Sequence, residues 1–461
     1  MRTARIVGLA LAFGTVAHGQ SLPPKDVAAR LIDSLAKDFM TQNGAPSMVL
    51  AVVRGSDTIA MGAWGTADRE KNIAATMQSI YRVGSVTKQF TSVLVMQLVE
   101  QKKVSLDSAI GVYLPALPEK WRRATVTQLL NHTSGIPSYT DVGQRWVSRW
   151  GEDMTPATLV ELTAKDTMWF EPGTNWKYDN SGYVVLGMLI EKMTGRPWST
   201  EVVERLSKPL GLADTRACDS KPNDPRAAKG YNPQNTSWSA APYLSMTQPY
   251  AAGSMCSTVR DLAAWNRALG TGKVVSAASY AAMTTPVGAA SSSNYGFGLM
   301  RQSLGSHTVI THGGAVHGFI TANAWVPDAE LSVTVLTNAA NAPAERLLQQ
   351  SARAALGIPL IPAPRPAPPV VKLTEAERNQ YTGVFSLKLP SGARDFTFTD
   401  RGGTIFAQLE GQGANALIPY GNHTFGAAFD GTLRITFTVE NGKATKLLLQ
   451  QAGQTIEGTR K

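Results

Sequence analysis

The chain has 461 residues, of which 43% are hydrophobic and 17% charged, and its formal net charge is +10. This length allows two or three domains with a full hydrophobic core. No run of lysine and arginine is interleaved with aromatic residues. The moderate positive charge therefore indicates general solubility and affinity for anionic envelope polymers rather than nucleic-acid binding. Two cysteines are too few for a cysteine-rich zinc site and the six histidines lack an HExxH spacing, so we expect neither a metal nor an organic cofactor.

The first 19 residues have the pattern of a signal peptide. Arg2 and Arg5 precede an apolar run at 6–17, and a small-x-small cleavage pattern ends at Gly19. The run is too short to span a bilayer, and no later run reaches that length. We therefore expect residues 1–19 to be removed and the mature protein to be secreted or periplasmic, without an integral membrane segment.

The next segment predicts a helix followed by two strands. The helix covers about 24–40, with Val27 and Leu31 on its expected apolar stripe. The strands are expected at 48–54 and 58–64, joined by a short polar turn.

Lys88 lies on a helix that should be buried on all sides. Apolar residues of the segment 83–99 point in nearly every direction around a helix, and a helix that is apolar all round is buried. A buried lysine is costly unless it is paired or deprotonated. Ser85 lies one turn earlier on the same face, at the helix N-terminus, where Gly84 lets the chain enter the helix. This is the arrangement of an activated serine nucleophile, the Ser-x-x-Lys element of penicillin-recognising serine enzymes.

A second Ser-x-x-Lys copy, Ser34 to Lys37, shows that the spacing alone is a weak signal. Ser34 is in the middle of its helix, where no N-terminal dipole acts on it, and Lys37 is expected to face solvent. For Ser85 and Lys88 the alternative is a helix start whose lysine reaches water, but the apolar surroundings leave few wet directions. We therefore predict Ser85 as the nucleophile and Lys88 as its base.

Strands from both ends of the first domain flank a long helical segment. Residues 106–269 are mostly helical in pattern. They are followed by four strand signals and a helix signal, at 295–301, 309–312, 319–326, 331–336 and 344–356. Because strands and helices are segregated rather than alternating, we predict an α+β fold in which an antiparallel sheet is flanked by helices and joined by a helical lobe. The cleft between two such lobes is a natural ligand site.

Tyr178 and Asn180 supply polar groups that a serine–lysine enzyme needs. They lie two positions apart in an extended loop before an apolar helix, so they point to the same side. Tyr178 could pass a proton to the leaving group, and Asn180 could orient Lys88 and hydrogen-bond a substrate amide. The alternative is an ordinary helix cap with a core tyrosine.

His312, Gly313 and Gly314 are expected at the end of a strand. Paired glycines let a substrate backbone approach the strand edge, and His312 could bind a carboxylate or assist proton transfer. The peptide N–H of Ala315 could join that of Ser85 as an oxyanion hole. The alternative is a strand-end turn with an exposed histidine.

Cys218 and Cys256 are the two cysteines of the chain. In an oxidising compartment they could form a disulfide, and two separate buried thiols are the alternative.

A proline-rich stretch at 361–370 reads as a stiff linker between two folded parts, 20–360 and 371–461. Seven short strand signals at regular spacing follow it, at 383–389, 395–399, 404–409, 416–420, 424–428, 433–440 and 444–450. We predict a small all-β barrel or sandwich in this region.

Taken together, these segments resemble the serine β-lactamase and penicillin-binding-protein family, in its class C-like branch. Several spaced motifs in order are far more specific than any one of them. The resembling motifs occur in the family's order over about 25–357: Tyr81 to Phe90, Leu129 to Gly135, Phe170 to Gly173, Tyr178 to Tyr183, Ala252 to Thr258, Tyr295 to Gly298 and His312 to Phe319. The β segment resembles the lipocalin-like domain that is often appended to these hydrolases.

The resemblance implies a β-lactamase/transpeptidase-like fold with Ser85 as the acyl-forming nucleophile and Lys88 as its base or proton shuttle. Tyr178 would be the second proton relay and Asn180 a substrate-positioning residue. His132 is typical of the family and is expected to be structural.

Two departures from the family bear on the substrate. His312-Gly313-Gly314 stands where the family's β-lactamases usually carry Lys-Thr-Gly, which favours D-peptides and esters over β-lactams. Asp179 stands where a serine or alanine is common, and His317 where a proline is common.

The expected function is therefore an exported serine hydrolase that forms an acyl-enzyme at Ser85 with D-amino-acid peptides, esters or β-lactams. Its expected partner is a small-molecule or peptide substrate, such as a peptidoglycan fragment. One alternative is a non-catalytic receptor for peptidoglycan fragments or β-lactams, and another gives the main role to the β domain as a ligand-binding module.

Overall fold

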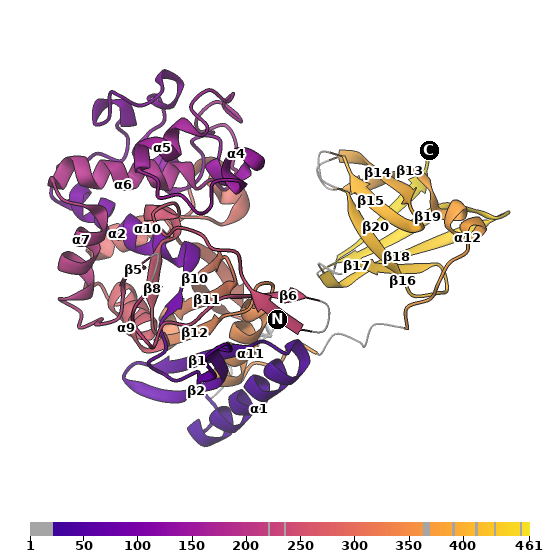
Figure 1. Cartoon of the computed structure of the whole chain (residues 1–461), viewed down its shortest axis with the longest axis horizontal. Helices are drawn as coiled ribbons and strands as arrows, with labels where there is room; N and C mark the ends of the chain where they lie inside the picture. The colour runs from indigo at the N-terminus through magenta and orange to yellow at the C-terminus, as the bar shows by residue number, and fades with distance from the viewer. Residues whose placement is uncertain are drawn as a thin grey trace, which may run out of the picture. The chain divides into compact units, whose positions relative to one another are not determined.

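A computed structural model describes residues 22–461 apart from seven short gaps, at 220–221, 235–236, 363–368, 390–391, 411–413, 428–429 and 452–453. The expected signal peptide at 1–19 lies outside the described residues, and so do six positions of the expected linker. The chain divides into two units that separate after Leu360 (Figure 1). Each unit is described by itself.

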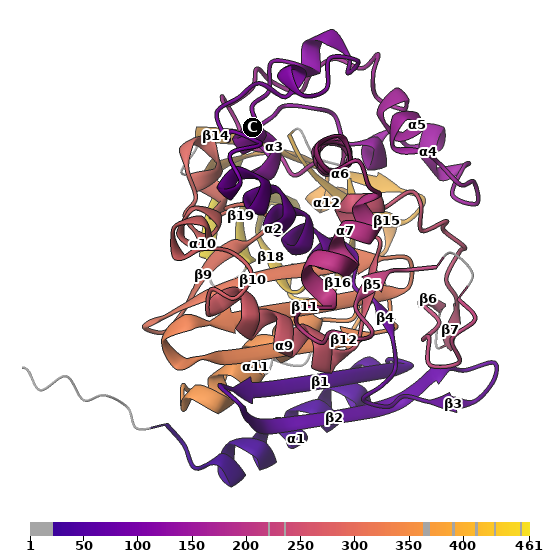
Figure 2. The ribbon, with the colours of Figure 1, turned by 90° about the vertical axis from the view of Figure 1, so that its left-hand side faces the viewer.

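An antiparallel sheet forms the centre of the first unit. Within the described residues it has seven strands in the order β3-β2-β1-β12-β11-β10-β9, and Figure 2 shows its strands β2, β1, β12, β11 and β10 in this succession. The strands are β1 Ser47–Arg54, β2 Asp57–Asp68, β3 Ile73–Ala74, β9 Met300–Leu304, β10 His307–Val316, β11 Phe319–Val326 and β12 Leu331–Thr337. Because β1 pairs with β12, the sheet joins the beginning of the unit to its end.

Helices cover the two faces of this sheet with separate apolar cores. On one face α1 (Lys25–Asn43) packs on α11 (Ala344–Leu356), and both bury apolar residues against the strands. On the other face α9 (Val259–Gly270) contacts β12 and β1, and α2 (Thr87–Glu100) belongs to the same large core. The predicted α+β architecture of an antiparallel sheet flanked by helices is confirmed.

The remaining helices form a lobe at the opposite end of the unit from α1 (Figure 1). At the centre of this lobe are α2 and α6 (Ser181–Thr194), which bury nearly all of their apolar residues. The members are α3 Val126–Leu130, α4 Gln144–Val147, α5 Pro156–Glu161, α6 Ser181–Thr194, α7 Trp198–Val202, α8 Tyr250–Gly253 and α10 Ala277–Thr284.

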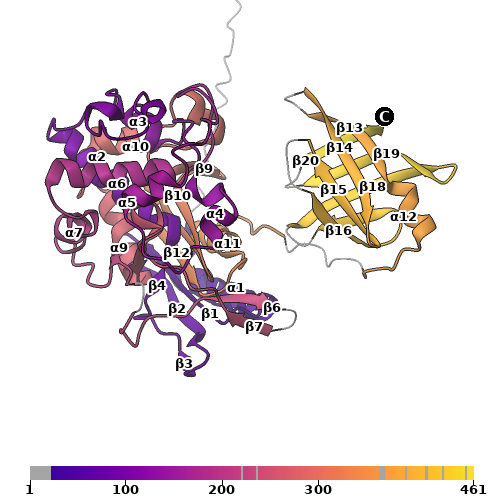
Figure 3. The ribbon, with the colours of Figure 1, turned by 45° about the horizontal axis from the view of Figure 1, so that its top comes forward.

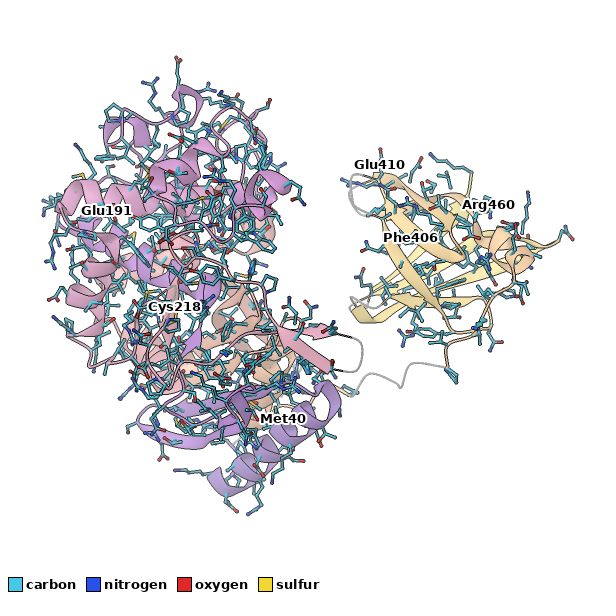
Figure 4. All side chains as sticks on the ribbon, in the orientation of Figure 1. Met40, Glu191, Cys218, Phe406, Glu410 and Arg460 are labelled. Carbon is cyan, nitrogen blue, oxygen red and sulfur yellow. A yellow bond between two sulfur atoms is a disulfide. The ribbon has the colours of Figure 1, made fainter. Side chains whose placement is uncertain are left out.

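A short strand, β8 (Met255–Ser257), forms a small three-stranded sheet with the segment before Ser85. It pairs with β4 (Tyr81–Arg82) on one side and with β5 (Arg216–Ala217) on the other. Cys256 of β8 forms a disulfide with Cys218, which is labelled in Figure 4. Of the two alternatives left open by the sequence, the structure has the disulfide. A two-stranded ribbon, β6 (Tyr231–Gln234) with β7 (Ser237–Ala240), completes the unit.

Three expectations for the first unit are wrong. The strand expected at 295–301 begins later, because β9 covers Met300–Leu304. The buried face of α1 consists of Ala28, Ile32, Ala36 and Phe39, while Val27 and Leu31 are exposed. The strand expected to end at His312 continues through both glycines to Val316, because β10 keeps its pairing with β11 over that stretch.

The second unit is a closed antiparallel barrel of eight strands, β13 to β20, within its described residues (Figure 3). The strands are β13 Gly383–Leu389, β14 Gly392–Arg401, β15 Thr404–Leu409, β16 Asn415–Pro419, β17 Thr424–Ala427, β18 Asp430–Glu440, β19 Lys443–Gln451 and β20 Gln454–Arg460. The predicted barrel is confirmed, but the sequence analysis missed β20 and the helix α12 (Glu375–Tyr381). Arg460, labelled in Figure 4, donates to the carbonyl oxygens of Gln380 and Thr382 and so ties β20 to the end of α12.

Candidate active site

Ser85 lies in a turn of 3-10 helix, Gly84–Val86, that runs directly into α2. Lys88, one turn on, is completely buried. Its Nζ lies 3.2 Å from Ser85 Oγ, and it donates to Asn180 Oδ1 at 2.8 Å and to the carbonyl oxygen of Ala252 at 2.9 Å. The all-round apolar pattern of the sequence therefore indicated correctly that this lysine is inside the protein.

Burial lowers the pKa of Lys88 to about 7, and the negative charge of Asp179 opposes part of that shift. A large fraction of Lys88 is consequently a neutral amine at neutral pH and can accept a proton from the neighbouring serine. The second Ser-x-x-Lys copy lacks this environment, because Ser34 and Lys37 are both exposed and Lys37 pairs with Asp33.

Tyr178 lies beside both members of the pair. Its ring centroid is 4.7 Å from Nζ of Lys88, and its hydroxyl interacts with the side chain of Ser85. Burial raises the pKa of the Tyr178 hydroxyl above its usual value, so this group keeps its proton at neutral pH. Tyr178 is thus placed as a neutral hydroxyl that can donate to, or relay a proton toward, a group bound at Ser85.

Asn180 is fixed in one orientation by its neighbours. Its Oδ1 accepts from Lys88, and its Nδ2 donates to Oγ1 of Thr140 at 3.1 Å. Its peptide N–H donates to Oγ of Ser138 at 3.0 Å. Because an amide nitrogen carries two hydrogens, one remains for a ligand carbonyl in the adjoining pocket.

Strand β10 packs closely against the turn that contains Ser85, and each of the two segments has a glycine at the contact: Gly314 in the strand and Gly84 in the turn. A Cβ built on Gly84 would lie 2.8 Å from the nitrogen of Ala315, and one built on Gly314 would lie 1.9 Å from the carbonyl oxygen of Val83. Both glycines are therefore required for this close approach. Ser85 and Ala315 line the same pocket, as expected for two peptide N–H groups that converge on one oxyanion.

His312 is buried behind Tyr178, with 6.4 Å between the two ring centroids. Its Nδ1 donates to the carbonyl oxygen of Gly313 at 2.5 Å, and its Nε2 accepts from the hydroxyl of Tyr295 at 2.8 Å. Burial and the charge of Lys88 lower the His312 pKa to about 3, so the ring is neutral at working pH. It contacts the site through Tyr295 rather than from the pocket wall.

A pocket of about 120 Å³ opens beside Ser85. Of the predicted site residues, the described wall contains Ser85, Asn180 and Ala315, whereas His312, Gly313 and Gly314 are not part of it. The sequence analysis singled out His317 of this wall but not the other members: Tyr139, Thr140, Trp146, Leu244, Pro249, Ala252, Gly253 and Val316. These residues come from three separate segments, and no spacing in the sequence connects them.

His317 belongs to an aromatic corner of this pocket. Its ring centroid lies 4.2 Å from that of Trp150, and its Nδ1 donates to the carbonyl oxygen of Pro242 at 3.0 Å. Trp146 packs on Trp150 and donates to Oε1 of Gln248 at 2.7 Å. Because α4 ends at Val147, Trp150 lies in the turn that follows the helix, and no helix-face spacing in the sequence indicates this ring contact.

The described residues contain neither a cluster of metal ligands nor a helix that could span a membrane. None of their histidine, cysteine, aspartate and glutamate side chains gather in groups of three or more that could hold a metal ion. Within the same part of the chain, no helix is long and apolar enough to cross a membrane.

The fold and the buried serine–lysine pair define a serine hydrolase of the β-lactamase and transpeptidase type. The model of the Beta-lactamase family matches residues 32–357, and the chain belongs to this family. A D-aminopeptidase of Gluconobacter oxydans is 26% identical over 328 residues, which are 69% of this chain and 60% of that protein. Penicillin-binding protein 4 of Amycolatopsis lactamdurans is 34% identical over 178 residues, 37% of this chain and 45% of that protein. The chain thus spans less than two thirds of the length of both relatives.

Among solved structures, a D-stereospecific amidohydrolase from a Streptomyces species is 29% identical with a TM-score of 0.60. The match covers 72% of this chain and 98% of that protein. Relatives of this kind are hydrolases, and the chain is a hydrolase of the same serine family.

Proposed function

We propose that this protein is an exported hydrolase that cleaves amide or ester bonds of D-amino-acid derivatives through an acyl-enzyme on Ser85. The observation that carries the proposal is the 3.2 Å contact between Ser85 Oγ and the fully buried Nζ of Lys88. A buried amine with a pKa of about 7 beside a helix-terminal serine is the arrangement that makes a hydroxyl nucleophilic.

Acylation in this scheme transfers one proton and exchanges one bond. Ser85 Oγ attacks the substrate carbonyl carbon while its proton passes to the neutral Lys88. The resulting oxyanion accepts from the peptide N–H groups of Ser85 and Ala315. Tyr178 then donates its proton to the leaving nitrogen or oxygen and recovers one from Lys88, so the pair is neutral again when the product leaves.

Deacylation reverses these roles with water as the nucleophile. Tyr178 relays a proton from the attacking water to the neutral Lys88, and the Lys88 ammonium returns a proton to Ser85 Oγ when the acyl bond breaks. Asn180 holds the acyl group through its remaining amide hydrogen, because its other contacts fix the orientation of the amide.

The described wall of the pocket supplies no cation for an anionic substrate group. None of the described residues that line it is an aspartate, glutamate, lysine or arginine, and its walls are largely aromatic and aliphatic. His312 is neutral, so it supplies no cation for the carboxylate of a β-lactam. Together with the D-aminopeptidase and D-amidohydrolase relatives, this favours D-amino-acid amides, short D-peptides and esters over β-lactams as substrates.

The proposed site of action is the periplasm or the extracellular space. The disulfide between Cys218 and Cys256 is stable in an oxidising compartment and is rarely found in the cytosol. Peptide fragments of peptidoglycan contain D-amino acids and would meet the enzyme there.

The decisive experiment combines labelling with a substrate panel. A fluorophosphonate should add to the tryptic peptide that contains Ser85, as seen by mass spectrometry, and Ser85→Ala should lose both the adduct and turnover. Ser34→Ala is the matched control, since Ser34 belongs to the exposed copy of the motif. Wild-type rates for the p-nitroanilides of D- and L-alanine, p-nitrophenyl acetate and nitrocefin give the substrate class. An adduct on Ser34, or preference for the L-anilide or for nitrocefin, would contradict the proposal.

A further inference from the structure

Asp179 is a buried carboxylate that has no lysine or arginine partner among the described residues. It is 1% exposed, and Nδ1 of His132 lies 3.5 Å from its Oδ2. Its Oδ1 accepts from the peptide N–H of Gly182. This places the carboxylate at the N-terminus of α6, where the peptide dipoles favour a negative charge.

Gly182 makes room for that carboxylate. A Cβ at this position would lie 2.8 Å from Oδ1 of Asp179, which is closer than side-chain packing allows. Gly182 thus lets the carboxylate of Asp179 pack directly against the backbone of the first turn of α6, and a hydrogen bond from this backbone stabilises the negative charge.

His132 combines a strained backbone with a buried side chain that is only partly hydrogen-bonded. Its φ of 62° lies in the left-handed region, and the side chain is completely buried. The peptide N–H of Asp179 donates to its Nδ1 at 3.3 Å, while its Nε2 has no hydrogen-bond partner within the described chain. Strain, burial and an unpaired nitrogen at one residue are features that cluster at functional sites.

Asp179 and His132, which we call the buried couple, adjoin the rings that surround Lys88. The His132 ring is 4.3 Å from that of Tyr178 and 5.3 Å from that of Tyr183, measured between centroids. Nζ of Lys88 lies 4.7 Å and 5.2 Å from the centroids of the same two rings. A charge in so dry a place acts over several ångströms with little screening.

We propose that the buried couple is the internal counter-charge of the Ser85–Lys88 pair and sets the pH at which Lys88 can take the serine proton. When Ser85 Oγ bonds to the acyl carbon, its proton converts Lys88 to an ammonium ion away from solvent. The fixed negative charge of Asp179 stabilises that ion and the transition state leading to it. Asp179 acts through Lys88 and is a positioning residue, and the inference rests on the proposed acyl-enzyme function.

Asp179 is the group that supplies this charge. Burial raises the pKa of the surrounding tyrosines and lowers the pKa of the surrounding histidines, so all of them are neutral near pH 7. These neighbours are Tyr178 in the loop before α6, Tyr183 in α6, Tyr295 before β9, His132 after α3 and His312 in β10.

The test is the pH dependence of kcat/KM for a p-nitrophenyl ester in the full-length Asp179→Asn variant. The asparagine keeps the size and an oxygen for Gly182 and removes only the charge. Because the charge of Asp179 raises the Lys88 pKa, the acid limb should move to lower pH by roughly half a unit, and the plateau rate should fall by up to about threefold as the base weakens. Asp57→Asn, which removes an exposed carboxylate paired with Lys25, should change neither.

An acid limb that stays in place in the folded Asn variant overturns the inference, even if the rate falls, since a purely structural role changes the rate without moving the limb. If that variant does not fold, Asp179→Ser, whose hydroxyl can also accept from Gly182, gives the same readout.

The wild-type enzyme adds a measurement that needs no variant. Its acid limb should lie at the same pH at low and at high salt, because the buried couple is out of reach of dissolved ions. A limb that moves with salt would assign its position to surface charges and overturn the inference. Failure of the wild type to form an adduct at Ser85 would instead contradict the proposed function.

Discussion

Gly314 lies so close to Val83 that a Cβ on this glycine would be 1.9 Å from the Val83 carbonyl oxygen and 3.2 Å from the nitrogen of Ser85. At Gly313 the added atom would lie 3.5 Å from the carbonyl oxygen of Thr321, an ordinary contact. Of these two adjacent glycines, only Gly314 is in a position where a side chain would clash, and the clash would be with the backbone that supports Ser85.

Gly314→Ala should accordingly push β10 away from the serine turn and lower kcat/KM for an ester by roughly a hundredfold, the scale of a displacement of about 1 Å in an active site. Gly313→Ala is the matched control and should remain close to the wild type. Equal effects of the two substitutions on ester turnover would show that the close approach does not position Ser85.

Replacement of Lys88 by alanine should lower the rate of Ser85 acylation by about a hundredfold or more, the usual scale for loss of a general base. In the wild type, kcat/KM should fall as the pH drops below about 7, because the amine is then protonated and cannot accept the serine proton. Lys37→Ala should leave the rate and pH profile unchanged. A profile that is flat between pH 6 and 8 would exclude Lys88 as the base.

The same lysine should make stability depend on pH. Its pKa is about 7 when folded and 10.5 in its unperturbed state, so between these values the unfolded chain binds a proton that the folded chain does not. Stability must then rise with pH across this window. The free energy of unfolding of the wild type relative to Lys88→Met should increase by about 2 kcal/mol from pH 7 to pH 9. Urea titrations of both proteins measure it, and a pH-independent difference would contradict the depressed pKa.

Loss of the disulfide should weaken the support of the nucleophile as well as the fold. Cys218 and Cys256 are 38 positions apart, and closing a loop of this size stabilises a protein by about 3 to 4 kcal/mol. Cys256 pairs with Arg82, three positions before Ser85. The double variant Cys218→Ser/Cys256→Ser should melt at a lower temperature and hydrolyse esters more slowly. A reductant should lower both quantities in the wild type and have no further effect on the variant.

Removal of the barrel should leave the chemistry intact. The first unit contains the whole candidate site and two apolar cores of its own, and the barrel has a separate core. A chain that ends at Leu360 should therefore be soluble and form the Ser85 adduct at a rate near that of the full chain. An insoluble or unreactive product would show that the barrel is needed for the catalytic unit.

The sequence predicted the serine–lysine pair because two independent signals met at Lys88, the motif spacing and a helix without a polar face. It failed where small residues carry the packing. On α1 the buried face contains Ala28 and Ala36, whose weak hydrophobic signal was outweighed by the larger Val27 and Leu31 on the exposed side. At β10 two glycines suggested a strand end, whereas pairing with β11 keeps the backbone extended through them.

The polar helix α12 was missed although its cap can be read from the sequence, and distant contacts lie beyond sequence reasoning. The helix α12 is polar and is defined by its capping box between Thr374 and Glu377 rather than by an apolar stripe. The contact of Asn180 with Thr140 joins residues 40 positions apart, and that of Lys88 with Ala252 joins residues 164 positions apart. Local propensity contains no information on such pairs, because the fold as a whole brings them together.

The pairing of β1 with β12 has a consequence for how the molecule acquires its activity. At one end of this pairing the peptide N–H of Ser47 donates to Oδ1 of Asn338, across 291 positions of chain. The β1–β2 hairpin is local and can form early. The pairing of β1 with β12 can form only when nearly the whole unit is available, and long-range pairing of this kind is slow. The strand β10, which supports Ser85, joins the sheet through β11 and β12. Reactivity of the serine during refolding should therefore emerge late and in one step, together with closure of the sheet.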